Sequence, residues 1–294
     1  MTRLRMLCLA LAACLLLPGV AQAATAPKRF YVSLGDSYAT GYQVLSADGT
    51  KKDNTRNGFP YQVPKLAAKR GYDLKLVNFG CGGATTTSLL EQTAPCSNRV
   101  FDSHSWGGKT QLAAAEKFLR AHRGKVALVT VSIGGNDVTA CARDADPFSC
   151  VAAATQSLKE NVTEAAVRLR AAAGKKVKIV GTTYPDVILG AWVGANPNQS
   201  LAQASVVGFK NLINPTLKEA YAEAKGGFAD VTAATGAYTP FERTTTLAPY
   251  GVIPRAVAKV CELTYYCSFR DIHSTTAGYK VIAKLVAKQL PKRG

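Results

Sequence analysis

Residues 31–42 read Tyr-Val-Ser-Leu-Gly-Asp-Ser-Tyr-Ala-Thr-Gly-Tyr. The first four are β-branched, aromatic or small, and they predict a buried strand. Gly35 and Asp36 then end the strand and leave Ser37 at its carboxyl end. In α/β proteins, ligands bind at that edge of the sheet. Ser37 is therefore a candidate nucleophile, although Gly, Asp and Ser are also the commonest residues of an ordinary turn.

The first 23 residues are typical of a secretory signal peptide and not of a folded segment. A basic start, with Arg3 and Arg5, precedes an apolar run and an Ala-Gln-Ala cleavage site that ends at residue 23. Cys14 follows Leu-Ala-Ala, which resembles a lipoprotein box, but apolar residues continue beyond it. Lipid attachment at Cys14 is therefore the minor alternative. No second apolar run is long enough to span a bilayer, so we expect a secreted, extracellular protein.

Six cysteines remain after the leader, and an even number in an exported chain indicates disulfide bonds. Their closeness in sequence favours three local pairs. The expected bonds are Cys81–Cys96, Cys141–Cys150 and Cys261–Cys267. A zinc site is disfavoured because the chain has no Cys-x-x-Cys and only 3 histidines. We expect neither a metal nor a cofactor.

The chain is strongly basic, with 36 Lys and Arg against 19 Asp and Glu. Without Arg3 and Arg5, which leave with the leader, the net charge is +15. Such a charge favours an anionic partner, such as a phospholipid surface, an acidic cell-wall polymer or nucleic acid. Nucleic acid is disfavoured because no basic cluster is interleaved with aromatic residues. The alternative is a protein that is basic only for solubility.

The order of predicted elements indicates an α/β fold. Apolar, β-rich runs predict strands at 28–34, 74–79, 126–133, 176–183 and 227–231. Helical spacing predicts helices at 58–69, 83–90, 110–122, 149–173, 199–225 and 273–289, the fifth with a kink at Pro215. This alternation implies one mostly parallel five-stranded sheet with helices on both faces.

Residues 24–294 contain no linker and no repeat, so we expect a single domain. Two stretches, 182–197 and 232–271, show no regular pattern. Loops of this length are usually functional or mobile.

Two further strands end in glycine-rich turns. Gly-Cys-Gly-Gly at 80–83 lets backbone amides approach a ligand closely, but the Gly-Lys-Ser/Thr of a nucleotide-binding loop does not follow it. Gly-Gly-Asn-Asp at 134–137 presents Asn136, and a neutral amide donor suits an oxyanion hole. The alternative for Asn136, or for Asp137, is an ordinary helix cap.

Asp271 and His273 precede the last predicted helix. A histidine has a pKa suited to proton transfer near neutrality. Beside an Asp, in a chain with a serine at a strand end, it fits a set of nucleophile, base and orienting group. A lone histidine is more often structural, so this assignment depends on Ser37.

The four stretches together resemble the GDSL or SGNH hydrolase family in order and spacing. They are Gly-Asp-Ser at 35–37, the glycine turn at 80–83, Gly-Gly-Asn-Asp at 134–137 and Asp-x-His at 271–273. The resemblance covers nearly the whole exported chain, and with its six cysteines the chain is most similar to secreted actinobacterial esterases and lipases. It implies a flavodoxin-like three-layer αβα sandwich and a serine carboxylic ester hydrolase without a cofactor.

The resemblance also implies roles for individual residues. Ser37 would be the nucleophile, and His273 the general base and then the general acid. The backbone amides of Ser37 and Gly83, with Gly82 as the near alternative, and the side chain of Asn136 would form the oxyanion hole.

The chain departs from the family pattern at two positions. Tyr38 replaces the leucine of Gly-Asp-Ser-Leu, which we expect to matter little. Arg270 stands where the family motif Asp-x-x-His has its acid, and Asp271 lies one residue later. Asp271 would orient His273 either by its carboxylate or by its main-chain carbonyl, as in family members that dispense with the acid.

Lipid or phospholipid acyl esters are the expected substrates, hydrolysed by a monomer at an anionic interface. Export, the positive charge and apolar residues in the two irregular stretches favour them. These residues are Val187, Ile188, Leu189, Trp192, Val193, Leu247, Tyr250, Val252 and Ile253. The alternatives are a deacetylase of carbohydrates or small esters, an acyltransferase, and a non-catalytic protein that binds anionic surfaces.

Overall fold

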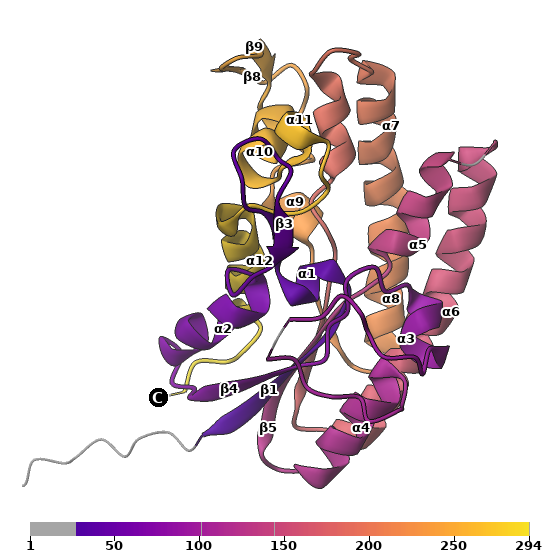
Figure 1. Cartoon of the computed structure of the whole chain (residues 1–294), viewed down its shortest axis with the longest axis vertical. Helices are drawn as coiled ribbons and strands as arrows, with labels where there is room; N and C mark the ends of the chain where they lie inside the picture. Colours follow the sequence, from indigo (N-terminus) through magenta and orange to yellow (C-terminus); the bar gives the residue numbers. More distant parts are fainter. Residues whose placement is uncertain (1–27, 101, 144, 294) are drawn as a thin grey trace, which may run out of the picture.

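The computed structural model describes residues 28–100, 102–143 and 145–293. The expected leader at 1–23, with Cys14, lies outside these residues. Figure 1 shows a central sheet with helices on either side. Among the described residues, none of the helices is both long enough and apolar enough to cross a bilayer.

Five parallel strands form the central sheet in the order β4–β1–β5–β6–β7 (Figure 1). They are β1 (Arg29–Gly35), β4 (Leu74–Asn78), β5 (Val126–Ser132), β6 (Lys178–Thr182) and β7 (Gly227–Ala229). The chain goes from β1 to β4 on one side and then crosses to β5 on the other. Open α/β sheets bind ligands at the carboxyl ends of the strands, where the order reverses in this way. All five expected strands are present, and the flavodoxin-like sandwich is confirmed.

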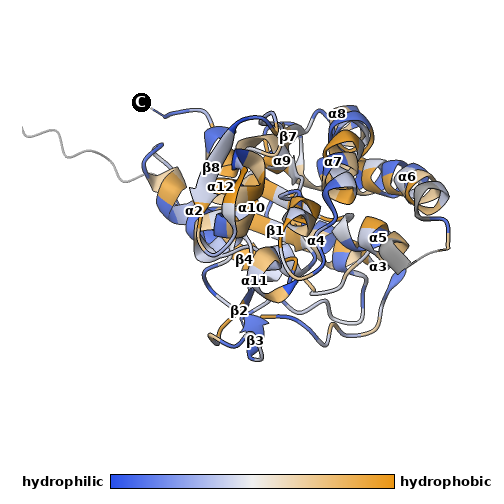
Figure 2. Cartoon of the chain, turned by 90° about the horizontal axis from the view of Figure 1, so that it is seen from above, coloured by the Kyte–Doolittle hydropathy of each residue, from blue (hydrophilic) through white to orange (hydrophobic). Residues whose placement is uncertain are grey.

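Alternate residues of β1 explain why helices cover both faces. Val32 and Leu34 belong to a buried cluster with α4 (Gln111–Ala121), α6 (Pro147–Ala173) and α8 (Asn214–Glu223). Tyr31 points to the opposite face and packs with α2 (Phe59–Ala68) and α12 (Thr276–Lys288). Side chains along a strand alternate between faces, so an apolar strand needs a helix layer on each. Figure 2 shows these layers from above, with hydrophobic strands in the middle.

Two helices begin later than predicted, because threonine side chains cap them. Thr275 accepts a hydrogen bond from the backbone N–H of Gly278, so α12 begins at Thr276 and His273 lies in the preceding loop. Thr85 caps α3 (Thr86–Glu91) in the same way. The glycine turn therefore lies outside a helix.

The predicted helix at 199–225 is interrupted close to the expected kink. A π-helical turn (Phe209–Ile213) separates α7 (Gln199–Gly208) from α8. Pro215 follows this turn and lacks the N–H that a regular helix would use.

The expectation of irregular structure at 232–271 is wrong. This stretch contains a hairpin of β8 (Thr244–Leu247) and β9 (Gly251–Pro254), followed by α10 (Arg255–Leu263) and α11 (Tyr266–Phe269). At 182–197, a 3₁₀ helix, η2 (Val187–Trp192), packs against α10. Each element is too short for its periodicity to show in the sequence.

Several short elements were also not expected. They are α1 (Ser37–Thr40), the antiparallel strands β2 (Tyr42–Val44) and β3 (Lys52–Asn54), α5 (Gly135–Thr139), η1 (Ala140–Arg143) and α9 (Val231–Ala234). The β2–β3 hairpin had no strand signal because β3 reads Lys-Asp-Asn, which are poor strand formers.

Most apolar residues of the two stretches belong to the core and do not form a lipid-binding surface. Leu189, Val193 and Ile253 lie in a buried cluster with α10. Val252 differs from them, because it is 71% exposed at the β8–β9 hairpin.

Three disulfide bonds join the six cysteines in the expected pairs. Cys81 is bonded to Cys96, Cys141 to Cys150, and Cys261 to Cys267. The first holds the glycine turn that follows β4, and the third joins α10 to α11 shortly before His273.

Candidate active site

Ser37 is the first residue of α1, directly beyond the carboxyl end of β1. Gly35 has φ +134°, and a Cβ there would lie 2.0 Å from the carbonyl oxygen of Ser132 on the neighbouring strand. Only glycine fits this close contact. Asp36 caps α1 by accepting a hydrogen bond from the backbone N–H of Tyr38 at 2.9 Å. The chain thus turns sharply at Gly35 and presents Ser37 at the sheet edge.

Ser37, His273 and Asp271 form a hydrogen-bonded series. The Nε2 atom of His273 lies 2.8 Å from the Oγ atom of Ser37. Its Nδ1 atom lies 2.7 Å from Oδ1 of Asp271, and the same oxygen accepts the backbone N–H of His273 at 3.0 Å. When Nδ1 carries the ring proton, Nε2 is free to accept the proton of the serine hydroxyl.

The contact to His273 is made by the carboxylate of Asp271, one of the two alternatives left open by the sequence. Arg270, at the usual family position of the acid, points elsewhere: its guanidinium donates to the carbonyls of Gly190 at 3.2 Å and Val193 at 2.9 Å. The acid is therefore shifted by one residue along the chain.

A lysine balances the charge of Asp271. The Nζ atom of Lys52, on β3, donates to Oδ2 of Asp271 at 2.8 Å. Burial alone raises the pKa of Asp271, but the hydrogen bonds from His273 and Lys52 outweigh it and hold the pKa well below its usual range. Asp271 is therefore a buried but charged carboxylate.

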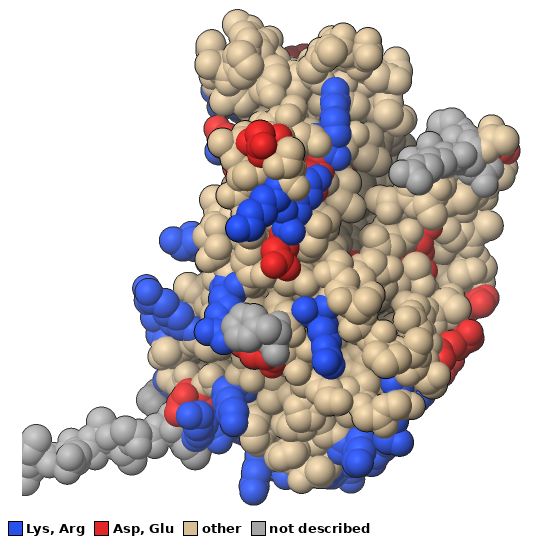
Figure 3. Space-filling view, in the orientation of Figure 1, with Lys and Arg blue, Asp and Glu red and all other residues tan. Residues whose placement is uncertain are grey.

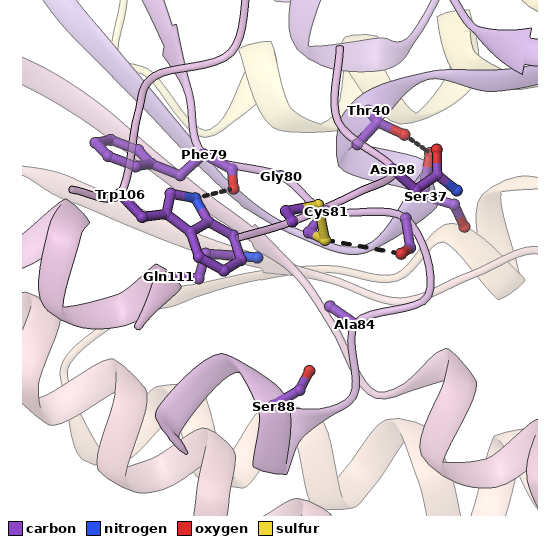
Figure 4. The surroundings of a disulfide bond; sticks show 12 residues. Ser37, Thr40, Phe79, Gly80, Cys81, Ala84, Ser88, Asn98, Trp106 and Gln111 are labelled. Atoms are coloured by element: carbon purple, nitrogen blue, oxygen red, sulfur yellow. Dashed lines mark hydrogen bonds between the residues drawn. A yellow bond between two sulfur atoms is a disulfide. The ribbon is translucent and has the colours of Figure 1, made fainter. Parts of the chain in front are cut away.

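The glycine turn lies beside the serine motif. The backbone N–H of Cys81 donates to the carbonyl of Gly35 at 2.9 Å, and Figure 4 shows the disulfide of Cys81 near Ser37. The N–H of Gly82 donates to the carbonyl of Asn98 at 2.7 Å and is not available to a ligand. In the part of the chain that the structure describes, the N–H of Gly83 has no hydrogen-bond acceptor. The geometry thus favours Gly83 over Gly82 as an oxyanion donor.

Asn136 reaches the glycine turn and does not cap a helix. Gly134 occupies the cap position of α5, and the Nδ2 atom of Asn136 donates to the carbonyl of Ala84 at 2.8 Å. Asp137 accepts hydrogen bonds from the backbone N–H and the hydroxyl of Thr86, the first residue of α3. These contacts tie the turn after β5 to the turn after β4, so all the predicted site residues gather at one edge of the sheet.

Tyr38, expected to matter little, connects two parts of the site. Its hydroxyl donates to the carbonyl of Ile272 at 2.7 Å, between Asp271 and His273. The ring of Tyr42 packs 4.6 Å from that of His273. The tyrosine at position 38, where the family motif has leucine, was the sequence feature that could have indicated this contact.

Two further residues that sequence reasoning missed support the serine motif. Gln111 binds Gly35 twice, accepting its N–H at 2.7 Å and donating to its carbonyl at 3.1 Å. Tyr184 donates its hydroxyl to Asp36 at 2.5 Å. Burial raises the pKa of Asp36 to about 7, although the hydrogen bonds from Tyr184 and Tyr38 oppose the rise.

No metal site accompanies this arrangement in residues 28–100, 102–143 and 145–293. No group of three or more His, Cys, Asp or Glu side chains there is placed to hold an ion.

Residues 33–281 match the family model described as the GDSL-like lipase/acylhydrolase family. The chain belongs to this family. It is therefore a GDSL-type hydrolase of the esterase and lipase class. No curated protein matches the chain closely enough to count as a relative.

Several solved structures resemble this GDSL-family chain. An extracellular lipase from Streptomyces rimosus is 18% identical with a TM-score of 0.54, over 89% of this chain and 99% of that one. A phospholipase A1 from Streptomyces albidoflavus is 19% identical, with a TM-score of 0.48, over 89% and 99%. An aryl esterase from M. smegmatis is 16% identical, with a TM-score of 0.46, over 89% and 97%. At such identities the first likeness supports the fold alone.

Proposed function

We propose that this GDSL-family chain is a secreted serine hydrolase that cleaves carboxylic esters, foremost lipid acyl esters, through an acyl-enzyme on Ser37. The hydrogen-bonded series of Ser37, His273 and Asp271, with contacts of 2.8 and 2.7 Å, carries the proposal. A serine becomes nucleophilic when an adjacent base accepts its proton and a third group orients that base.

The reaction proceeds in two halves. His273 removes the proton of Ser37 as Oγ forms a bond to the ester carbonyl carbon. The tetrahedral intermediate collapses, the bond to the alkoxy oxygen breaks, and His273 returns the proton to the leaving alcohol. Water then attacks the acyl-enzyme with His273 again as base, which releases the acid and restores Ser37. Throughout, the carboxylate of Asp271 stabilises the imidazolium form of His273.

Three donors would hold the negative oxygen of the intermediate. They are the backbone N–H groups of Ser37 and Gly83 and the side-chain amide of Asn136. Each arises at the carboxyl end of a different strand, β1, β4 or β5. Donors fixed by the fold cost no reorganisation during the reaction, and this makes an oxyanion hole effective.

Lipid acyl esters remain the first choice of substrate, supported by charge and by exposed apolar side chains. Leu201, near the start of α7, is 46% exposed, and Val252 is 71% exposed. The β8–β9 hairpin and the start of α7 lie at the upper end of the molecule in Figure 1. Together with the positive net charge, they suit an anionic lipid interface.

Secretion is part of the proposal. A leader at 1–23 and three disulfide bonds both fit an oxidising, extracellular location. The protein would act there as a monomer.

Labelling with a fluorophosphonate probe tests the nucleophile. The mature, disulfide-bonded protein should be modified at Ser37, as peptide mapping would locate, and Ser37→Ala should be neither labelled nor active. Thr40→Ala, in the same short helix, is the matched control and should label normally. If the folded wild type resists the probe, with and without lipid vesicles, the chain is a binding protein and the proposal is wrong.

Relative rates on esters of different acyl length test the substrate class. We expect long-chain p-nitrophenyl esters and phospholipid vesicles to be hydrolysed faster than p-nitrophenyl acetate or acetylated xylan. A strong preference for acetyl esters would instead identify a deacetylase. Transfer of the acyl group to an added alcohol in preference to water would identify an acyltransferase.

A further inference from the structure

We propose that Lys52 is a positioning residue of the active site, which holds the carboxylate of Asp271 toward His273. This inference rests on the proposed function, because it assigns His273 as the general base. Its contact is direct: Nζ of Lys52 lies 2.8 Å from Oδ2 of Asp271.

The two oxygens of Asp271 have separate partners. Oδ1 accepts the ring and backbone N–H groups of His273, and Oδ2 accepts Lys52. With both oxygens engaged, the carboxylate cannot rotate without losing a hydrogen bond. Hydrogen bonds between charged groups are about twice as strong as neutral ones, so this contact is a stiff support for the imidazole.

The burial of Asp271 distinguishes this ion pair from one between two exposed side chains. The side chain of Asp271 is only 7% exposed, and that of Lys52 is 31% exposed. Exposed ion pairs contribute little because water screens them, whereas a buried carboxylate that loses its partner retains an uncompensated charge. The amino group thus reaches Asp271 at the boundary between protein and solvent.

The hairpin that carries Lys52 lies beside the shifted acid. Asp271 lies two residues before His273, whereas the usual family motif places the acid three before it, where this chain has Arg270. The shifted acid lies next to the β2–β3 hairpin, which also packs Tyr42 against His273. Lys52 and Asp271 are 219 residues apart in sequence, so the hairpin must be folded onto the site for the contact to form.

The electrostatic effect has a definite sign. A cation close to a base disfavours the protonated form of that base, and the charge of Lys52 lies next to the carboxylate that contacts His273. Removing Lys52 should therefore move the acid limb of the pH profile of kcat/KM upward. The other titratable side chains around the pair are Asp36, Tyr38, Tyr42, Tyr265 and Tyr279. These neighbours are acids and phenols, so the positive charge next to Asp271 comes from Lys52.

The test compares Lys52→Met with Lys51→Met in the mature protein. Lys51 is the adjacent exposed residue, and its replacement removes the same charge without touching Asp271. We expect Lys52→Met to lower kcat/KM about tenfold, a part of the ~10²–10⁴-fold that general base catalysis supplies. We expect its acid limb to rise by roughly half to one pH unit. Lys51→Met should keep the wild-type profile.

Two further variants separate positioning from a general structural effect. Lys52→Arg should restore the wild-type acid limb because it keeps the charge. In an Asp271→Asn background, Lys52→Met should lower kcat/KM much less than it does in the wild type, because the carboxylate that Lys52 positions is gone. Thermal unfolding confirms that each variant is folded.

The outcomes distinguish this inference from the proposed function. If Lys52→Met and Lys51→Met have the same pH profile while Ser37→Ala is inactive, Lys52 has no such role but the serine mechanism stands. If Ser37→Ala keeps its activity, the proposed function itself is wrong. If Lys52→Met lowers kcat/KM equally with and without the Asp271 carboxylate, Lys52 acts on another group and the inference is overturned.

Discussion

Asn136 has two side-chain N–H groups, and the structure uses one of them. That N–H donates to the carbonyl of Ala84, which holds the amide against the glycine turn. Among residues 28–100, 102–143 and 145–293 the second has no acceptor and can serve a ligand, since a side-chain amide has two donors. The bond to Ala84 therefore orients Asn136 before any substrate arrives, as an effective oxyanion donor requires.

Replacing Asn136 with alanine should lower kcat by about 10²–10³, the usual cost of losing one oxyanion donor. KM should change much less, because the donor acts on the transition state. Steady-state kinetics on a soluble ester would measure both. Asn161→Ala is a control, since Asn161 bonds the hydroxyls of Thr86 and Thr87 and not the glycine turn. Near-normal turnover of Asn136→Ala would remove it from the oxyanion hole.

Asp36 predicts a pH dependence of stability. Its pKa is 3.8 in an unfolded chain and is raised by burial to about 7 in the folded protein. Between these pH values the unfolded state has released the proton that the folded state keeps, so rising pH favours unfolding. The free energy of unfolding should fall by up to about 1.4 kcal/mol per pH unit in this window.

Asp36→Asn removes this decline because an amide does not ionise. Urea unfolding from about pH 4 to about pH 7 should show a shallower decline for the variant than for the wild type. Asp186, whose pKa burial also raises to about 7, remains in both proteins and cancels in the comparison. Parallel curves would mean that Asp36 is ionised in the folded protein across this range.

At the scale of elements, two disulfide bonds lie in the segments that follow β4 and β5, and only the first closes a loop that carries site residues. Cys81–Cys96 closes the loop that carries Gly82 and Gly83 (Figure 4), and Cys141–Cys150 joins η1 to α6. A bond that closes a longer loop stabilises more by restricting the unfolded chain.

The double variants Cys81→Ala/Cys96→Ala and Cys141→Ala/Cys150→Ala should each lose about 2–3 kcal/mol of stability. Only the first should also lose most of its activity under conditions where both are folded, because Gly83 would no longer be held beside Ser37. Denaturant unfolding and ester hydrolysis, measured on the same samples, give both quantities. Full activity of the first variant would mean that the glycine turn needs no cross-link.

At the scale of the whole molecule, positively charged side chains outnumber negatively charged ones. Figure 3 shows Lys and Arg spread over the viewed face with fewer acidic residues. On α12, Lys280, Lys284 and Lys288 are exposed and four residues apart, so they share one side of the helix. An anionic surface would be attracted to such a side, and salt would weaken the attraction.

Adsorption to vesicles of anionic phospholipid should therefore fall as salt rises from low concentration to about 0.5 M, where exposed charges are strongly screened. Lys280→Glu/Lys284→Glu/Lys288→Glu should bind these vesicles more weakly than the wild type and hydrolyse a soluble short-chain ester at the same rate. Cosedimentation measures the binding. Equal, salt-independent binding of both proteins would show that the positive charge serves only solubility.

The sequence by itself determined the fold class and the identities of the candidate site residues. Apolar, β-rich runs predicted the five strands, the fifth of them short, because burial on both faces of a sheet requires continuous hydrophobicity. The position of Ser37 followed from where such a run stops. These features are local, and a local pattern is what a sequence displays directly.

Only the tertiary structure decided how those residues are supported. Lys52 and Asp271, Tyr38 and Ile272, and Gln111 and Gly35 are each far apart in the chain, and no spacing rule relates them. The choice of the Asp271 carboxylate over its carbonyl also depended on the path of the loop before α12. These contacts are set by packing between elements. The β2–β3 hairpin and α10 form part of that packing, and each is too short to be predicted from its sequence pattern.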